Sequence, residues 1–183
     1  MGLSILIPVR NEEDIIEDTL KYFLNSWIKE IEYEIIIIDD FSNDKTVEKT
    51  KNFNSQNLNI KIIGNKKPGL GSAISLGIEN STKQFVTIFM ADLSDSVIDL
   101  KEYYTLIDNH KCDAIFGSRF ISGSIVKDYP ISKYILNRIA NNIIRLIFFV
   151  QYNDFTNAFK IYKKTTLLKL FPLVSENFNI FLE

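Results

Sequence analysis

The sequence predicts an α/β fold in which helices cover both faces of a mainly parallel sheet. Four apolar runs rich in β-branched residues recur along the chain, at residues 3–9, 33–39, 58–64 and 85–91. Segments with the apolar spacing of helices lie between these runs, and this alternation favours right-handed βαβ units. Residues 35–38 are four consecutive isoleucines. A strand that is apolar on both sides is typical of the inside of such a sheet.

The segments between the runs carry helix start signals. We expect Asn11 to cap a first helix, because three acidic residues follow it and negative charge suits a helix N-terminus. Those residues are Glu12, Glu13 and Asp14. This helix should end near Lys29. Further helices should begin around residue 44, after residue 71 and near residue 97, and a fifth strand should cover residues 113–118.

A long helical pattern covers residues 131–150. Isoleucines recur four residues apart, at Ile131, Ile135, Ile139, Ile143 and Ile147. A polar row has the same spacing, at Lys133, Asn137, Asn141 and Arg145. One interpretation is a core face opposite a solvated face. The alternative is a helix at a membrane surface, which Phe148, Phe149 and their basic neighbours would suit.

Length and composition favour one globular domain. The 183 residues are 46% hydrophobic, and 21 basic against 23 acidic residues give a formal charge of −2. This balance provides no basic field for a nucleic-acid partner. A lone cysteine, Cys112, and a lone histidine, His110, exclude an internal disulfide, a Cys/His zinc site and a His-based triad.

Targeting signals are not evident in the sequence. Met1 runs directly into a strand-like segment, and no apolar run reaches the roughly 18 residues of a membrane span. We therefore expect a cytoplasmic protein whose membrane contact, if any, is peripheral. The last three residues, 181–183, include no Gly or Pro terminator, so we expect the domain to be truncated at its C-terminal end.

Acidic side chains follow two of the predicted strands, at the edge where parallel α/β sheets bind ligands. Asp39 and Asp40 end the second strand, and Asp92 and Asp95 follow the fourth. Clustered carboxylates favour a divalent cation, a ribose or a base as partner. Since side chains alternate along a strand, only one of the first pair can face a ligand, and we assign that role to Asp40. The alternative is that these carboxylates accept backbone amides in turns and caps.

Gly69 and Gly71 open the helix after the third strand. Glycines let a backbone approach phosphate or sugar closely, although an ordinary helix-start turn uses them equally. The dinucleotide fingerprint belongs after the first strand, and no GK[ST] follows here. The segment therefore predicts neither a dinucleotide site nor a P-loop.

Six short motifs, in order along the chain, resemble those of family 2 glycosyltransferases, above all the enzymes that make dolichyl- and polyprenyl-phosphate sugars. They are IPVRNE at 7–12, IDDFS at 38–42, GLGSA at 69–73, MADLSD at 90–95, GSRF at 117–120 and DFTNAFK at 154–160. The resemblance implies a GT-A fold with a Rossmann-like, mainly parallel sheet. It also implies a nucleotide-sugar donor, Mg²⁺ or Mn²⁺, inversion at the anomeric carbon and a lipid-phosphate acceptor.

The resemblance further implies roles for single residues. Positions that line the nucleobase and ribose pocket in such enzymes are held here by Pro8, Arg10, Glu12 and Asp40, with Asp39 beside them. Gly69 and Gly71 match the loop beside the donor. Asp92 matches the last carboxylate of the metal motif, and Arg119 and Lys133 match basic residues of the acceptor phosphate site. Asp95 could bind the metal through water, orient the acceptor or cap a helix, and Asp154 could orient Arg119 or Lys133.

Three positions depart from the family pattern, one of them Lys133, which stands in place of a second acceptor arginine. Met90 stands where the metal motif begins with Asp, and we expect it to pack inward. Arg10 stands where Tyr is common. Magnesium often completes its shell with substrate phosphates and water, so Asp92 with the donor's diphosphate could suffice.

These observations predict a hexosyltransferase that moves a sugar from a UDP- or GDP-sugar to polyprenyl or dolichyl phosphate, at the cytosolic face of a membrane. Residues 1–183 would form one catalytic domain, with the donor held by residues 1–120 and the acceptor by residues 121–183. A phosphate dianion needs no general base to attack. Transfer to a glycan hydroxyl is an alternative and would need Asp95 or Asp154 as base. A catalytically inactive nucleotide-sugar-binding module is the other alternative, suggested by Met90.

Overall fold

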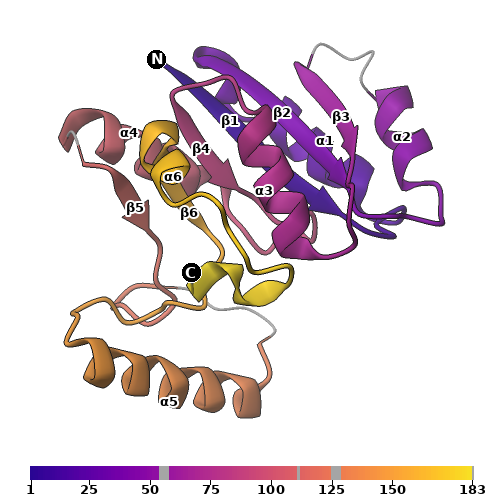
Figure 1. Ribbon diagram of the computed structural model, residues 1–183. Coiled ribbons are helices and arrows are strands. Elements are labelled where there is room, and N and C mark those ends of the chain that lie inside the picture. Colours follow the sequence, from indigo (N-terminus) through magenta and orange to yellow (C-terminus); the bar gives the residue numbers. More distant parts are fainter. Residues whose placement is uncertain (54–57, 111, 125–128, 183) are drawn as a thin grey trace.

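The computed structural model describes residues 1–53, 58–110, 112–124 and 129–182, so Glu183 lies outside the described part. One sheet runs in the order β3-β2-β1-β4-β6-β5 (Figure 1). Its strands are β1 (Gly2–Val9), β2 (Glu32–Asp39), β3 (Ile60–Gly64), β4 (Phe85–Ile88), β5 (Ala114–Phe116) and β6 (Lys160–Lys163). The first four are parallel, and β6 is antiparallel to β4 and β5. The predicted mainly parallel α/β sheet is confirmed.

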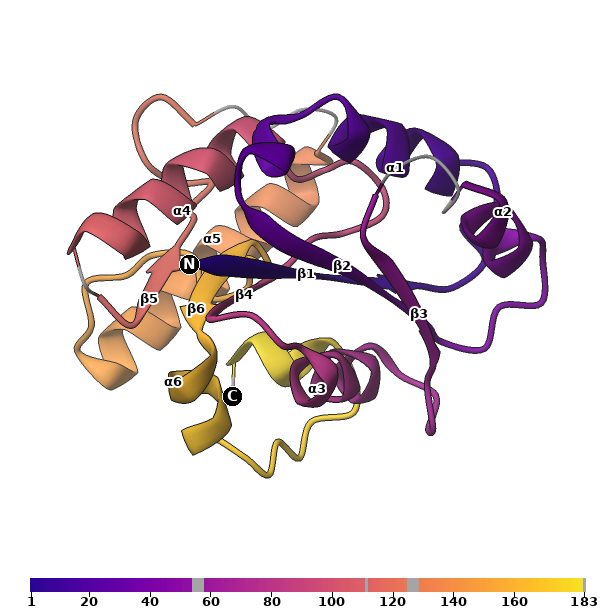
Figure 2. The ribbon, with the colours of Figure 1, turned by 90° about the horizontal axis from the view of Figure 1, so that it is seen from above.

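Helices cover both faces of the sheet, as the alternation of apolar runs predicts (Figure 2). One face packs against α1 (Ile16–Leu24), α2 (Thr46–Phe53), α4 (Val97–His110) and the short 3₁₀ turn η1 (Trp27–Glu30). The other packs against α3 (Leu70–Asn80), α6 (Lys164–Lys169) and η2 (Phe178–Leu182). Successive residues of β1 alternate between these two cores, with Ile5 and Ile7 in one and Leu6 in the other.

The first helix differs from its prediction at both ends. It begins at Ile16, and Asn11 does not cap it. Asn11 has a left-handed backbone with φ of 57°, and its Oδ1 accepts the Asn43 amide at 2.8 Å. The residue therefore ties the loop after β1 to the loop after β2. The helix ends at Leu24, and Ser26 caps a separate 3₁₀ turn that contains Lys29.

A strand that the sequence analysis missed separates β4 from β5. Residues 160–163 form β6, which pairs with Phe85–Thr87 on one side and with Ala114–Phe116 on the other. Its four residues, KIYK, are too few to show a clear period. Their pairing is set by the neighbouring strands, which supply the partners for both backbone edges.

The long helix α5 (Ile131–Phe148) presents the opposite face from the one we expected. The isoleucine row is exposed, with Ile139 and Ile143 each at 51% exposure, whereas Asn141 is 1% exposed. The polar row faces inward at its middle, where Asn141 Oδ1 accepts the Phe155 amide at 2.6 Å, whereas Lys133 and Arg145 at its ends are exposed. The interpretation of the isoleucines as a core face is thus wrong. Among the described residues, no helix is both long enough and apolar enough to cross a membrane.

Candidate active site

The carboxyl ends of β1 and β4 bring two predicted site residues together. Burial raises the pKa of Glu12, and the charges of Asp92 and Asp44 raise it further. Asp92 is exposed, with its Oδ1 accepting the Ser94 amide at 3.0 Å. Pro8 is buried near the end of β1, past the last residue that pairs with β4, so the amide that proline lacks is not needed there. This edge therefore presents the accessible carboxylate of Asp92 beside the buried end of β1.

Asp95 lies close to the same edge. Its Oδ2 accepts the Met90 amide at 2.8 Å. Burial raises the pKa of Asp95 to about 7, and the charge of Asp92 adds to this rise while that of Arg119 opposes it. The hydroxyl of Ser96, rather than Asp95, accepts the Ile98 and Asp99 amides in the first turn of α4. Met90 packs against the apolar core, as expected.

Asp39 and Asp40 have different partners, as the alternation of side chains along a strand requires. The Asp40 carboxylate, which we expected to face a ligand, is already hydrogen-bonded within the protein. This carboxylate is buried, accepts the Gly69 amide at 3.0 Å and the Asn65 Nδ2 at 2.7 Å, and lies 3.7 Å from Arg10 Nη1. Asp39 accepts the Ser42 amide in the turn after β2. The structure thus joins Asp40 to the loop after β3, and Arg10 remains half-exposed above it.

Gly69 and Gly71 permit a close approach of the chain to itself. A Cβ on Gly69 would lie 2.3 Å from the Glu176 carbonyl oxygen, and one on Gly71 would lie 2.0 Å from that of Ser175. The Glu176 carbonyl also accepts the Gly71 amide at 2.9 Å. In the described structure these glycines therefore let residues 175–176 pack on the start of α3, and their contact with a donor stays a prediction.

Arg119, in the loop after β5, and Asp154, in the turn before β6, form an extensive polar contact. Arg119 Nε and Nη2 donate to the two carboxylate oxygens of Asp154 at 2.9 and 2.7 Å, and the Arg119 amide donates at 2.8 Å. Asp154 is fully buried and raises the pKa of Arg119. Thr156 Oγ1 accepts a further bond from Arg119 at 2.9 Å. Asp154 thus holds the Arg119 guanidinium, and its role in orienting that group toward an acceptor stays a prediction.

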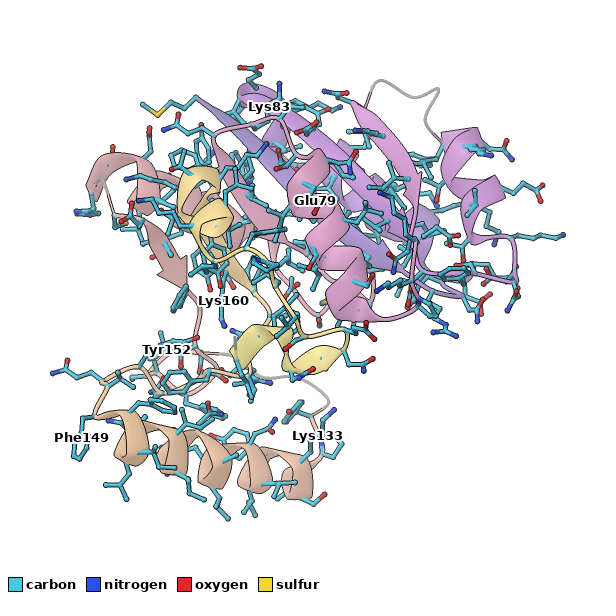
Figure 3. The ribbon with its side chains drawn as sticks, in the orientation of Figure 1. Glu79, Lys83, Lys133, Phe149, Tyr152 and Lys160 are labelled. Atoms are coloured by element: carbon cyan, nitrogen blue, oxygen red, sulfur yellow. The ribbon has the colours of Figure 1, made fainter. Side chains whose placement is uncertain are left out.

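Lys133 and Arg138 extend this positive region along α5. Lys133 Nζ lies 5.5 Å from the centre of the Tyr129 ring, and the Arg138 guanidinium lies 5.1 Å from that of Phe120. Neither forms an ion pair with a described carboxylate, and α5 itself contains no acidic residue. Figure 3 shows Lys133 near the start of the helix, with Phe149 just past its other end. We call Arg119, Lys133 and Arg138 the cationic cluster.

Sequence reasoning missed the residues that hold the cationic cluster in place. Tyr129 and Phe120 lie against its cations, and Asn141 joins α5 to the turn that contains Asp154. The spacing of Asn137 and Asn141 was visible, but solvent exposure accounts for a polar row as well as burial does. The basic residues of α5 have no acidic partner on the same helix, and only this feature of the sequence pointed to a buried role for its polar row.

The residues at the carboxyl ends of β1 and β4 fit a divalent ion only if further ligands complete its coordination. No group of three or more His, Cys, Asp or Glu side chains suited to a metal occurs in the described part of the chain. Asp92 offers an accessible carboxylate, and Glu12 lies near enough for the charge of Asp92 to raise its pKa. This donor set suits Mg²⁺ or Mn²⁺ that takes further oxygen ligands from phosphates and water.

Two relatives from the curated proteins are similar to most of the chain. The dolichol-phosphate mannosyltransferase of Pyrococcus furiosus is 28% identical over 139 residues, which are 75% of this chain and 39% of the relative. The poly-β-1,6-N-acetyl-D-glucosamine synthase of Staphylococcus aureus is 32% identical over 117 residues, 64% of this chain and 27% of the relative. The chain thus spans well under half the length of these relatives.

A solved structure shares the fold at low identity. Glucosyl-3-phosphoglycerate synthase from Mycobacterium tuberculosis, solved with Mn²⁺, uridine diphosphate and phosphoglyceric acid, matches with a TM-score of 0.74 and 13% identity over 99% of this chain and 61% of that one. The fold is that of the GT-A glycosyltransferases. The sequence profile of glycosyl transferase family 2 matches residues 4–171. With this match across nearly its whole length, the chain belongs to glycosyl transferase family 2.

Proposed function

We propose that the chain is the catalytic domain of an inverting glycosyltransferase that moves a hexose from a UDP- or GDP-sugar to polyprenyl or dolichyl phosphate. One observation carries the choice of acceptor, namely the cationic cluster. Lys133 and Arg138 have no acidic partner among the described residues. Arg119 lies close enough to Asp95 for its positive charge to oppose the rise in the pKa of that carboxyl. Unpaired cations beside a donor site suit an acceptor that is itself an anion.

The donor would lie across the carboxyl ends of the strands. Pro8, Arg10, Glu12, Asp39 and Asp40 are the proposed nucleobase and ribose residues, with Gly69 and Gly71 beside them. Asp92 would hold the metal together with the donor's diphosphate. A divalent ion there supplies positive charge that stabilises the departing nucleoside diphosphate.

The transfer itself needs no protein base. A phosphate monoester with a second pKa near roughly 6 is largely dianionic at neutral pH. One of its oxygens attacks the anomeric carbon from the face opposite the leaving group, and the bond from that carbon to the donor's diphosphate breaks. Arg119 and Lys133 hold the acceptor phosphate in line with that bond, and their positive charges offset its repulsion from the donor's diphosphate. The carbon is inverted, and no proton is transferred.

The exposed face of α5 is the proposed contact with a membrane. Its isoleucines point away from the protein body, beside exposed Phe148 and Phe149. A helix with one apolar face, one polar face and basic residues suits the boundary between headgroups and acyl chains. A polyprenyl acceptor has its tail in that bilayer, so the same helix would bring the cationic cluster to the lipid phosphate. The proposed location is the cytosolic face of a membrane.

A second candidate is transfer to a glycan hydroxyl, and Asp95 is the observation that favours it. A hydroxyl acceptor requires a general base whose pKa lies near the working pH. The pKa of Asp95, about 7, meets that need, and its carboxylate lies near Asp92 and Arg119. Asp154 is a poorer candidate because its carboxylate is buried and bonded to Arg119.

A transfer assay separates these functions from each other and from an inactive module. Purified protein is incubated with UDP- and GDP-hexoses, Mn²⁺ and one of two acceptors, undecaprenyl phosphate or a short oligosaccharide, and products are identified by mass spectrometry. The proposal expects a glycosylated lipid phosphate and loss of turnover in Asp92→Asn. A glycosylated oligosaccharide alone would instead support the second candidate. Binding of the donor without turnover on either acceptor would support the inactive module.

A further inference from the structure

The ring of Tyr129 lies close to two cations of the cationic cluster. The centre of its ring is 5.6 Å from the Arg119 guanidinium carbon and 5.5 Å from Lys133 Nζ. Cations are attracted to the faces of aromatic rings. One ring therefore holds two like charges near each other, although Coulomb repulsion would drive them apart.

The hydroxyl of Tyr129 already accepts two hydrogen bonds. Arg119 Nη1 donates to it at 3.3 Å. Asn137 Nδ2, in the second turn of α5, also donates to it. A phenol has two acceptor lone pairs and one proton to donate. Both lone pairs are in use, and no contact among the described residues takes the proton. The hydroxyl thus offers one donor, in a region that also contains Arg119 and Lys133.

We propose that Tyr129 binds the acceptor phosphate directly, by donating its hydroxyl proton to a phosphate oxygen while its ring keeps Arg119 and Lys133 at their spacing. This inference rests on the proposed function, because it adds a residue to the same acceptor site. A tetrahedral phosphate has enough oxygens for a guanidinium, an ammonium and a hydroxyl at once. Hydrogen bonds to ionised groups are the strong ones, so the contact should matter to affinity.

The decisive variant is Tyr129→Phe, which keeps the ring and removes the donor. Binding of farnesyl phosphate, inorganic phosphate and farnesol is measured by calorimetry at a temperature well below the unfolding midpoint of each variant. We expect the affinity for farnesyl phosphate to fall about tenfold, whereas stabilisation by UDP or GDP with Mn²⁺ should not change. Tyr104→Phe is the matched control, since it removes a hydroxyl that donates to Met1 at 2.8 Å and lies outside the cluster.

A purely structural role for the hydroxyl is tested by Asn137→Ala. This change removes one donor to Tyr129 and leaves the phenol proton in place, so it should weaken farnesyl phosphate binding much less than Tyr129→Phe does. Equal losses in the two variants would mean that the hydroxyl only links Arg119 to α5, and the inference would be wrong.

The remaining outcomes separate this inference from the proposed function. If Tyr129→Phe binds farnesyl phosphate as the unchanged protein does, the inference fails and the proposed acceptor stands. If the unchanged protein binds neither phosphate, or binds farnesol equally well, both fail. Tighter binding of farnesyl phosphate than of inorganic phosphate would assign the site to a lipid phosphate, and equal binding would assign it to the phosphate group alone. Either result supports a contact from Tyr129 if Tyr129→Phe also shows the tenfold loss.

Discussion

Asp154 is fully buried and gives both carboxylate oxygens to Arg119, which is 25% exposed. Removing one partner of a buried pair leaves an uncompensated charge, which typically costs several kcal/mol. Asp154→Asn should therefore destabilise the fold by about 2–3 kcal/mol, with solvent at Arg119 reducing the full value. It should also weaken binding of the acceptor, because the guanidinium is no longer held. Urea unfolding measures the first effect and acceptor KM the second.

An exposed ion pair supplies the control for this change. Asp113 is 71% exposed and pairs with Lys163 at 3.2 Å. Asp113→Asn should change stability by no more than about 1 kcal/mol, since exposed pairs contribute little. Similar losses in the two variants would contradict the structural importance given to Asp154.

Asp95 predicts a dependence of stability on pH. Burial raises its pKa from the ordinary value of 3.8 to about 7, so the folded state holds a proton that the unfolded state loses. Its favourable contribution is therefore complete below about pH 4 and is lost as the pH rises through 7. Asp95→Asn, which can still accept the Met90 amide, should be more stable than the unchanged protein at pH 8, by about 1–3 kcal/mol, and no more stable at pH 4.

Urea unfolding in EDTA at pH 4, 6 and 8 checks this prediction without bound metal. Asp99→Asn, at an exposed position in the first turn of α4, is the control and should change stability much less over the same range. A stability difference for Asp95→Asn that stays constant with pH would contradict burial of an ionisable carboxyl.

At the scale of elements, α5 predicts where a bilayer binds. Ile139→Asp with Ile143→Asp places two charges on the exposed apolar face, and binding to phospholipid vesicles should fall at least about tenfold. Because both side chains are about half exposed, the midpoint of thermal unfolding should hardly move. Sedimentation with vesicles provides the measurement.

The control places the same two charges elsewhere on the surface. Ile98 on α4 is 75% exposed and Leu168 on α6 is 45% exposed, and changing both to Asp should leave vesicle binding intact. Equal loss in the two double variants would show that charge alone weakens binding, and the proposed orientation of α5 would be wrong.

Patterns that depend on sequence spacing predicted the elements well, and those that depend on tertiary partners did not. The four parallel strands were predictable because long apolar runs between helical patterns have one common solution. The strand β6 was not, since its pairing depends on the edges of β4 and β5. The period of α5 was correct, but spacing cannot tell which face turns inward, and buried Asn141 decides that. Asn11 looked like a cap because a capping residue and a loop-tying residue have the same chemistry.

At the scale of the whole molecule, the order of the strands explains why the approach of two strand-end carboxylates was predictable. Parallel strands end at one edge, so Glu12 and Asp92 had to approach each other although 80 residues separate them. The proposed acceptor side was harder to predict. Arg119 could be identified from its motif, whereas the contacts of Tyr129 depend on how α5 docks. Asp40, chosen for a ligand, is bonded to Gly69 and Asn65, and no feature of the strand pattern indicates those partners.

The central claim is that Asp92, with a divalent ion, holds the diphosphate of an activated sugar. Thermal unfolding with UDP, GDP and their sugars, each with and without Mn²⁺, tests it most directly. A ligand at about 100 times its Kd stabilises a protein by about 2.7 kcal/mol, so one nucleotide class should raise the unfolding midpoint by several degrees only when Mn²⁺ is present. Asp92→Asn should abolish the part that depends on the metal. No shift with any nucleotide, or the same metal-dependent shift in Asp92→Asn, would contradict the account.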